Sequence, residues 1–218
     1  MRIAIIIYQR KLRLQKSEKN MKYNTDFVKR KMDKWSKYII DFDLPEYNNL
    51  PSIGLYMDQV ITLLSQYLGY LPFSEDRNAE SFITPNAINN YVRLGVMPAP
   101  VKKKYYKNHI AYLLMICVLK PSLSISDISQ LIPANMSEAE VPVFYNRFIQ
   151  IHKATSVKLI DHLQDIAGSP ETDTDVVELI VTSAVTTSLC KRFTEKTTAL
   201  RGLKDEEAER IMRATKSK

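Results

Sequence analysis

The chain has 218 residues, 45% of them hydrophobic and 25% charged, with a formal net charge of +7. This composition excludes an intrinsically disordered protein and allows one substantial core or two small domains. The pI near 9.2 favours an anionic partner. Residues 1–40 carry 12 basic and 3 acidic side chains, whereas residues 121–218 carry 12 and 14. The excess positive charge therefore lies outside the C-terminal half.

Cysteine usage and hydropathy predict a cytoplasmic protein. Cys117 and Cys190 are the only cysteines, and their apolar helical surroundings predict buried structural thiols rather than a disulfide or metal ligands. The apolar run Ile3–Ile7 is too short for a membrane span or a signal peptide, so no membrane association is expected. Because Met21 opens a more ordinary segment, residues 1–20 are a candidate for an over-extended start. An intact mass of the native protein would decide this.

Residues 1–54 are predicted to form a basic N-terminal arm and a connector. A polar, basic helix is expected over Asp26–Lys37, and the prolines, glycine and asparagines of Leu44–Gly54 are typical of a connector. Apolar residues at helical spacing then predict a helix from Met57 to Leu68 that ends at Gly69. A long polar turn is expected between Gly69 and Thr84.

The stretch Thr84–Lys120 contains six Lys and Arg residues and no Asp or Glu. Thr84 is a candidate helix cap before Pro85, and Gly95 is a candidate stop. The lysines and tyrosines of residues 101–106 predict a basic aromatic hairpin, and the nearly all-apolar segment 109–119 predicts a core helix. A short polar helix, a basic hairpin and a buried helix in this order are typical of a winged helix-turn-helix.

The C-terminal part of the chain is predicted to be helical. A capping box at Ser124–Asp127 predicts a short helix that ends before Pro133. Apolar residues at steps of three or four predict a long helix over 144–166. A second long helix is expected from about Asp173 to Leu189, although its Thr- and Ser-rich middle weakens that prediction. The expected organisation is therefore mostly α: an arm and connector (1–54), a winged helix-turn-helix head (55–133) and a C-terminal helical dimerisation or regulatory region (134–218).

Residues 57–132 resemble the DNA-binding head of MerR-type regulators. The matching segments are 88–98 (INNYVRLGVMP), 102–106 (KKKYY), 109–110 (HI) and 123–128 (LSISDI). The chain is even more similar to a small uncharacterised bacterial family, typical of low-GC Gram-positive organisms, whose LYMDQV and INNYV elements stand here at 55–60 and 88–92. Asn89 stands where many MerR-type heads have arginine, and the turn before Thr84 is longer than usual. The metal-binding cysteines of those regulators are absent, so the resemblance implies no metal-sensing role.

Eleven residues are candidate DNA contacts. Hairpin lysines can neutralise phosphates and release counterions, and tyrosines offer a rigid ring with a hydroxyl. Asn89 or Asn90 can pair with adenine through two hydrogen bonds if its side chain enters the major groove. Taken singly, each of these residues is more often a solvated surface residue, and Tyr91 and Tyr112 are expected to be core residues. The candidates are Thr84, Asn86, Asn89, Asn90, Arg93, Lys102, Lys103, Lys104, Tyr105, Tyr106 and Lys107.

The sequence gives little support for catalysis. The five glycines form no phosphate-binding pattern. His109, His152 and His162 do not have metal-ligand spacing, and no nucleophile has a recognisable partner. The chain is therefore predicted to be neither an enzyme nor a metal- or cofactor-binding protein.

The function predicted from the sequence is sequence-specific binding of double-stranded DNA in transcriptional control. A homodimer built mainly by residues 137–200 is expected, because a single head contacts few base pairs. The alternative is a non-catalytic helical protein-interaction module that retains the head fold without DNA binding. Asn89 in place of arginine favours the alternative, and the acid-free stretch opposes it. The sequence does not indicate the operator, a small-molecule effector, or activation rather than repression.

Overall fold

The computed structural model describes residues 23–41, 44–69, 83–167 and 170–202. Within these ranges the chain is mostly helical, as expected, and strand pairing is limited to two isolated bridges. The elements are α2 (Thr25–Asp41), the 3-10 helix η1 (Tyr47–Asn49), α3 (Met57–Tyr67), α4 (Pro85–Arg93), α5 (Lys107–Leu119), α6 (Ile125–Leu131), α7 (Glu140–Ala167) and α8 (Asp173–Ala199).

The chain divides into two compact units, residues 1–183 and residues 184–218. Helix α8 begins in the first unit and continues into the second. None of the described helices is long and apolar enough to cross a bilayer. Residues 1–20, and residues 70–82 of the expected polar turn, lie outside the described ranges.

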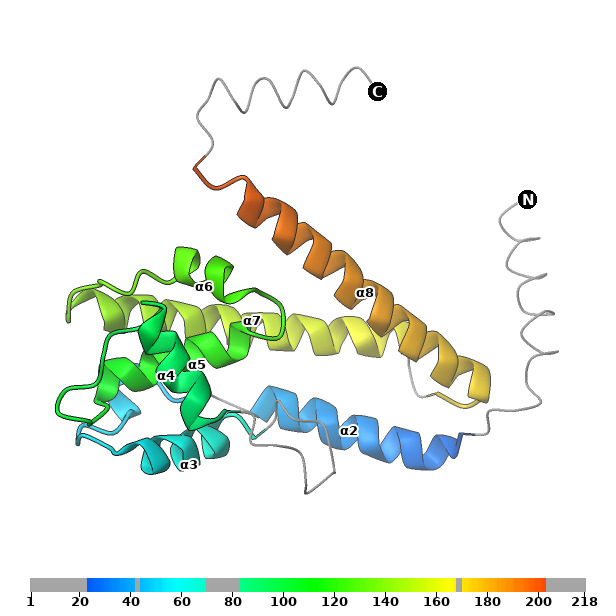
Figure 1. Cartoon of the computed structure of the whole chain (residues 1–218). Coiled ribbons are helices and arrows are strands. Elements are labelled where there is room, and N and C mark those ends of the chain that lie inside the picture. Colours follow the sequence, from blue (N-terminus) through cyan, green and yellow to red (C-terminus); the bar gives the residue numbers. More distant parts are fainter. Residues whose placement is uncertain (1–22, 42–43, 70–82, 168–169, 203–218) are drawn as a thin grey trace, which may run out of the picture. The chain divides into compact units, whose positions relative to one another are not determined.

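Helix α5 is the centre of the first unit (Figure 1). All residues from His109 to Cys117 are buried, and α3 and α7 pack against α5 while α4 packs against α3. A helix that is apolar on every side has to be enclosed by other elements, so the predicted core helix is confirmed. Helix α2 runs beside the C-terminal half of α7 (Figure 1).

The predicted helix ends are confirmed where the sequence carries capping residues. Thr84 Oγ1 accepts a hydrogen bond from the backbone N–H of Ala87 at the start of α4. Gly95 follows the same helix with a φ of 66°, a backbone conformation that glycine adopts without a steric penalty. Ser124 and Asp127 form the expected reciprocal capping box at the start of α6.

The connector around η1 is tied to two helices by polar groups. The Tyr145 hydroxyl donates to the carbonyl of Pro45 over 3.0 Å, and the Tyr47 N–H donates to Asn146 Oδ1 over 3.0 Å. The Tyr47 hydroxyl also donates to Asn108 Oδ1 at the first turn of α5. Burial raises the pKa of the Tyr145 phenol above its usual value. The connector around η1 is therefore fixed in place by side chains of α5 and α7.

The two cysteines differ in their surroundings. Cys117 is buried in α5, as predicted, and burial raises the pKa of its thiol to about 12. Cys190 is exposed, so the prediction of a buried thiol is wrong there. Leu189 and Phe193 are apolar neighbours in the sequence, but Lys191 and Arg192 follow Cys190 directly, and the described part of the second unit contains no other helix that could cover it. The Thr- and Ser-rich stretch does not interrupt α8, which is continuous to Ala199.

Candidate nucleic-acid interface

Helix α4 has one polar face that is open to solvent. Asn86, Asn89 and Arg93 are exposed and Asn90 is half-buried, whereas Ile88 is fully buried on the other side. Positions spaced by three, four and seven residues share one side of a helix. The four predicted contacts of α4 therefore lie on a single face that carries amides and a guanidinium and no carboxylate.

Two residues of this face are hydrogen-bonded to each other. Arg93 Nη2 donates to Asn90 Oδ1 over 2.7 Å. Asn86 and Asn89 lie one turn before Asn90 and Arg93, and their amides face solvent. Thr84 belongs to the frame of the helix, because its hydroxyl oxygen is used as the cap.

The predicted hairpin is a tight turn with two lysines at its tip. Val101 and Lys104 exchange both backbone hydrogen bonds, over 3.0 and 2.9 Å, which leaves Lys102 and Lys103 as the two loop residues. Their φ angles are 49° and 63°. Positive φ at both central positions is the property of a type I′ turn, where glycine and asparagine are the usual residues. Both lysines are exposed.

The hairpin is fixed to the chain segment that precedes α3. Leu55 and Tyr105 exchange two backbone hydrogen bonds, over 2.9 and 2.8 Å. The Tyr105 side chain is only 3% exposed, and its ring contacts the ring of His109 edge-on at 5.8 Å between centroids. Burial raises the pKa of the Tyr105 phenol. Tyr105 therefore supports the hairpin from the core side and does not present its ring to a partner.

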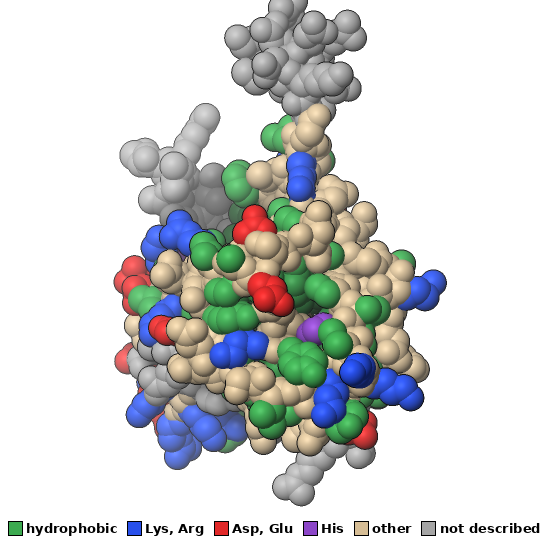
Figure 2. Space-filling model, turned by 90° about the vertical axis from the view of Figure 1, so that its left-hand side faces the viewer, with side chains coloured by type: hydrophobic (Ala, Val, Ile, Leu, Met, Phe, Trp, Pro, Cys, Tyr) green, Lys and Arg blue, Asp and Glu red, His purple; other side chains and the backbone are tan. Residues whose placement is uncertain are grey.

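The outer side of the hairpin carries aromatic rings and a cation. Lys104 Nζ lies 5.2 Å from the ring centroid of Tyr56, a cation–π contact, and Tyr56 is 55% exposed. The Tyr106 ring covers Gly54, where an added Cβ would lie 2.8 Å from Tyr106 Cζ. A side chain at position 54 would therefore displace the Tyr106 ring. Figure 2 looks onto the end of the first unit at which the α4–α5 loop lies, and basic side chains lie beside hydrophobic ones there.

His109 joins the base of the hairpin to α5. Its Nδ1 accepts a hydrogen bond from the Tyr106 N–H over 3.0 Å, and its Nε2 lies 3.0 Å from the carbonyl oxygen of Ala99. Because Nδ1 is an acceptor, these partners require the neutral ring with its proton on Nε2. The buried imidazole thus satisfies one backbone group on each side of the hairpin.

Lys107 is engaged in the fold. Its Nζ donates to the carbonyl of Asn48 over 3.1 Å and lies 5.3 Å from the ring centroid of Tyr47. Of the eleven predicted contacts, Thr84, Tyr105 and Lys107 thus act within the structure. The exposed face of α4 and the tip of the hairpin hold most of the others. Tyr56 and Gly54 were missed, because their role depends on a pairing across about 50 residues that the connector-like local sequence does not indicate.

The described residues do not contain a group of three or more His, Cys, Asp or Glu side chains arranged for a metal ion. The polar side chains of the face and hairpin are amides, phenols and cations, all of which can donate hydrogen bonds, and the lysines and Arg93 carry positive charge. Such a set suits an anionic surface rich in acceptors.

Residues 45–148 match the family model described as "Domain of unknown function (DUF1836)". This agrees with the expected likeness to an uncharacterised family. No curated protein and no solved structure matches the chain. The match begins at Pro45 and reaches Phe148, so it includes both partners of the Tyr145–Pro45 and Tyr47–Asn146 hydrogen bonds. The matched segment is therefore closed by contacts between its two ends.

Proposed function

We propose that the protein binds double-stranded DNA in the cytoplasm, sequence-specifically and in transcriptional control. The observation that carries this proposal is the pairing of an acid-free helix face on α4 with a hairpin whose tip consists of Lys102 and Lys103. Lysines in place of glycine at positive φ cost conformational energy. A functional role for the two positive charges at the tip would explain why lysines are retained there.

The expected mode of binding is that of a MerR-like winged helix-turn-helix. In support, α3, α4, the hairpin and α5 follow one another in the order of that fold. The Leu55–Tyr105 pairing also attaches the hairpin to the start of α3. In this mode α4 enters the major groove and the lysines contact phosphates beside it.

A homodimer is the second part of the proposal. Two recognition helices related by two-fold symmetry would contact half-sites one helical turn apart, which gives the specificity that one short helix lacks. Exposed apolar side chains on α8, including Val185, Leu189 and Phe193, offer a surface for this pairing. Residues 137–200 are the proposed dimerisation region.

A protein-interaction module is the alternative. The observation that favours it is the apolar content of the hairpin region, where Ile53, Tyr56 and Val101 are more than half exposed. Exposed apolar groups of this kind are common at protein interfaces. A basic rim would then select an acidic protein partner.

Fluorescence anisotropy with labelled random duplex, titrated at several salt concentrations, separates the two functions. The full-length protein is expected to bind, with an affinity that falls as salt rises. Lys102→Glu with Lys103→Glu should weaken binding to every duplex and lower the salt slope by about 0.9 for each lost phosphate contact. The matched control is Lys34→Glu with Lys37→Glu, an equal charge change at exposed positions of α2. If the wild type does not bind duplex at low salt, the DNA-binding function is excluded and the protein-interaction module is favoured.

A further inference from the structure

The hydrogen bond between Asn90 and Arg93 changes what the face of α4 can recognise. An asparagine amide has an acceptor, Oδ1, and a donor, Nδ2. Recognition of adenine in the major groove uses both, because adenine presents an acceptor at N7 and a donor at N6. In this structure Arg93 Nη2 donates to Asn90 Oδ1 over 2.7 Å. An adenine N6–H would therefore have to share this oxygen with Arg93.

The orientation of the Asn90 amide follows from its hydrogen bond with Arg93. The arginine guanidinium has five N–H donors and no acceptor, so only the oxygen of the Asn90 amide can face Arg93. With the oxygen engaged by Arg93, the free groups of the pair that donate hydrogen bonds are the Nδ2 group of Asn90 and the remaining N–H groups of Arg93. Together they form a surface that is complementary to two adjacent acceptors.

Guanine is the base that offers two adjacent acceptors, N7 and O6, in the major groove. Arginine binds them with two parallel hydrogen bonds, and this pairing is specific because the other bases lack that pattern. We infer that Arg93, held in position by Asn90, recognises a guanine, and that Asn90 is a positioning residue rather than a contact to adenine. This inference rests on the proposed function.

The position of Arg93 favours this role. Arg93 is exposed on the same face as Asn86 and Asn89, and no carboxylate lies within the sequence of α4. A free arginine side chain loses rotamer freedom when it binds a base. Because Asn90 already restricts the guanidinium, less freedom is lost on binding.

The test begins with selection of preferred duplexes from a random library by the full-length protein. The selected sites are expected to contain a required guanine. Replacement of that guanine by 7-deazaguanine removes the N7 acceptor and keeps the base pair. We expect the wild type to lose affinity about 5- to 150-fold on the deaza duplex. Arg93→Ala should bind normal and deaza duplexes alike, because alanine has no side-chain donor for N7.

The role of Asn90 is tested by the same comparison. The deaza penalty is the fold loss of affinity when guanine is replaced by 7-deazaguanine. Asn90→Ala should reduce this penalty while leaving the affinity for random duplex at low salt nearly unchanged. Asn90→Asp keeps an acceptor for Arg93, so the deaza penalty should persist even though the added negative charge weakens binding overall. A merely structural role would lower all affinities together and leave the penalty unchanged. Asn89→Ala is the matched control on the same face and should keep the full penalty at this guanine.

The outcomes distinguish the inference from the proposed function. Selected sites without a required guanine, or a loss of affinity on the deaza duplex that Arg93→Ala retains, would overturn the inference while DNA binding stands. An Asn90→Ala variant with the full penalty would overturn the positioning role. If the wild type binds no duplex at any salt concentration, the proposed function fails and the inference fails with it.

Discussion

Lys102 and Lys103 occupy a backbone conformation that suits neither residue. With φ angles of 49° and 63°, each Cβ is crowded by the following carbonyl, and the cost is about 1 kcal/mol per residue. The closed pair of hydrogen bonds between Val101 and Lys104 keeps the turn in this form. The tip of the hairpin thus carries two charges at some expense of stability, a combination that occurs at functional sites.

Exchange of these lysines for the residues that a type I′ turn prefers should raise stability and, under the proposed function, lower DNA affinity. Lys102→Asn with Lys103→Gly is expected to increase the free energy of unfolding by about 1–3 kcal/mol. The same variant should bind duplex more weakly, with a smaller salt slope. Urea denaturation and anisotropy measure the two effects. A variant that is both less stable and less able to bind would contradict the account of strain given for the turn.

His109 offers a second prediction at the scale of one residue. Its two nitrogens serve Tyr106 N–H and the Ala99 carbonyl. Asparagine can replace the Nδ1 acceptor and glutamine the Nε2 donor, so each variant keeps one bond. His109→Leu leaves both backbone groups without a partner. We expect the urea midpoint to fall modestly for His109→Asn and His109→Gln and further for His109→Leu. The free energy of unfolding of the Leu variant should fall by about 2–5 kcal/mol. Equal loss in all three would show that packing, not hydrogen bonding, sets the role of His109.

At the scale of elements, the start of α7 depends on Glu140. Its carboxylate accepts hydrogen bonds from the Ser137 N–H and hydroxyl, over 2.8 and 2.7 Å. These bonds, the backbone one first, lower the pKa of Glu140 below its usual value. A lowered folded-state pKa means that the stabilisation is present above the unfolded pKa, about 4.3, and is lost as pH falls through the folded pKa.

Glu140→Gln should therefore reduce the acid sensitivity of the fold. The variant is expected to be less stable than wild type at neutral pH, and the difference between them should shrink as the pH falls below about 4. Thermal unfolding followed by circular dichroism at a series of pH values measures this. Glu138→Gln is the control, since Glu138 is also exposed and lies outside the capping pair. An unchanged difference across the pH range would exclude the Glu140 cap as the cause.

The elements of the head were predictable where local chemistry determines them. Thr84, Gly95 and the Ser124–Asp127 box mark helix ends through bonds to their own neighbours. The lysine turn is different, because its sequence gives no glycine or asparagine at positions that need positive φ. Its conformation depends on pairing with Leu55, which is distant in the sequence. Charge and spacing therefore located the candidate site in the sequence, but they did not predict its geometry.

Burial also limited what could be predicted. Tyr105 and Tyr106 are adjacent tyrosines of similar local surroundings, yet one is enclosed beside His109 and the other covers Gly54 on the outside. Alternation along an extended segment separates their directions, but the sequence does not say which side faces the core. Cys190 is a further case: it is exposed although Leu189 and Phe193 are close to it in the sequence, and the described part of the second unit contains no other helix to cover it.

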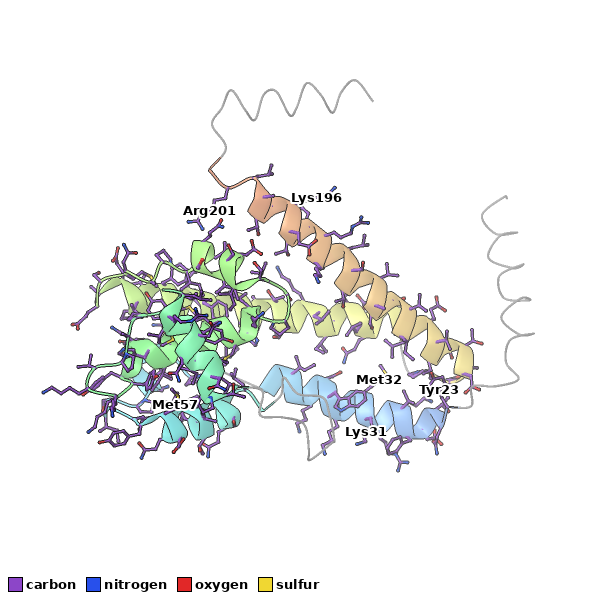
Figure 3. All side chains as sticks on the ribbon, in the orientation of Figure 1. Tyr23, Lys31, Met32, Met57, Lys196 and Arg201 are labelled. Atoms are coloured by element: carbon purple, nitrogen blue, oxygen red, sulfur yellow. The ribbon has the colours of Figure 1, made fainter. Side chains whose placement is uncertain are left out.

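At the scale of the whole molecule, helix α8 poses the question of assembly. In the second unit its described residues Val185, Leu189 and Phe193 are all exposed, with Leu189 at 62% and Phe193 at 74%. A spacing of four residues places them along one stripe of the helix. Figure 3 shows side chains extending from this part of α8, with Lys196 labelled near its end. Such a stripe is stable in water when a partner covers it.

The homodimer proposal predicts that this stripe is required for association of the full chain. Leu189→Glu with Phe193→Glu should convert a dimer to a monomer at micromolar concentration, because two charges would have to be buried in the interface. Multi-angle light scattering measures the mass, and circular dichroism checks that the helical content is retained. Thr194→Glu with Thr198→Glu adds the same charge on the opposite side of α8, and this variant should remain dimeric. A wild-type chain that is monomeric at this concentration, or a stripe variant that stays dimeric, would contradict the proposed homodimer through α8.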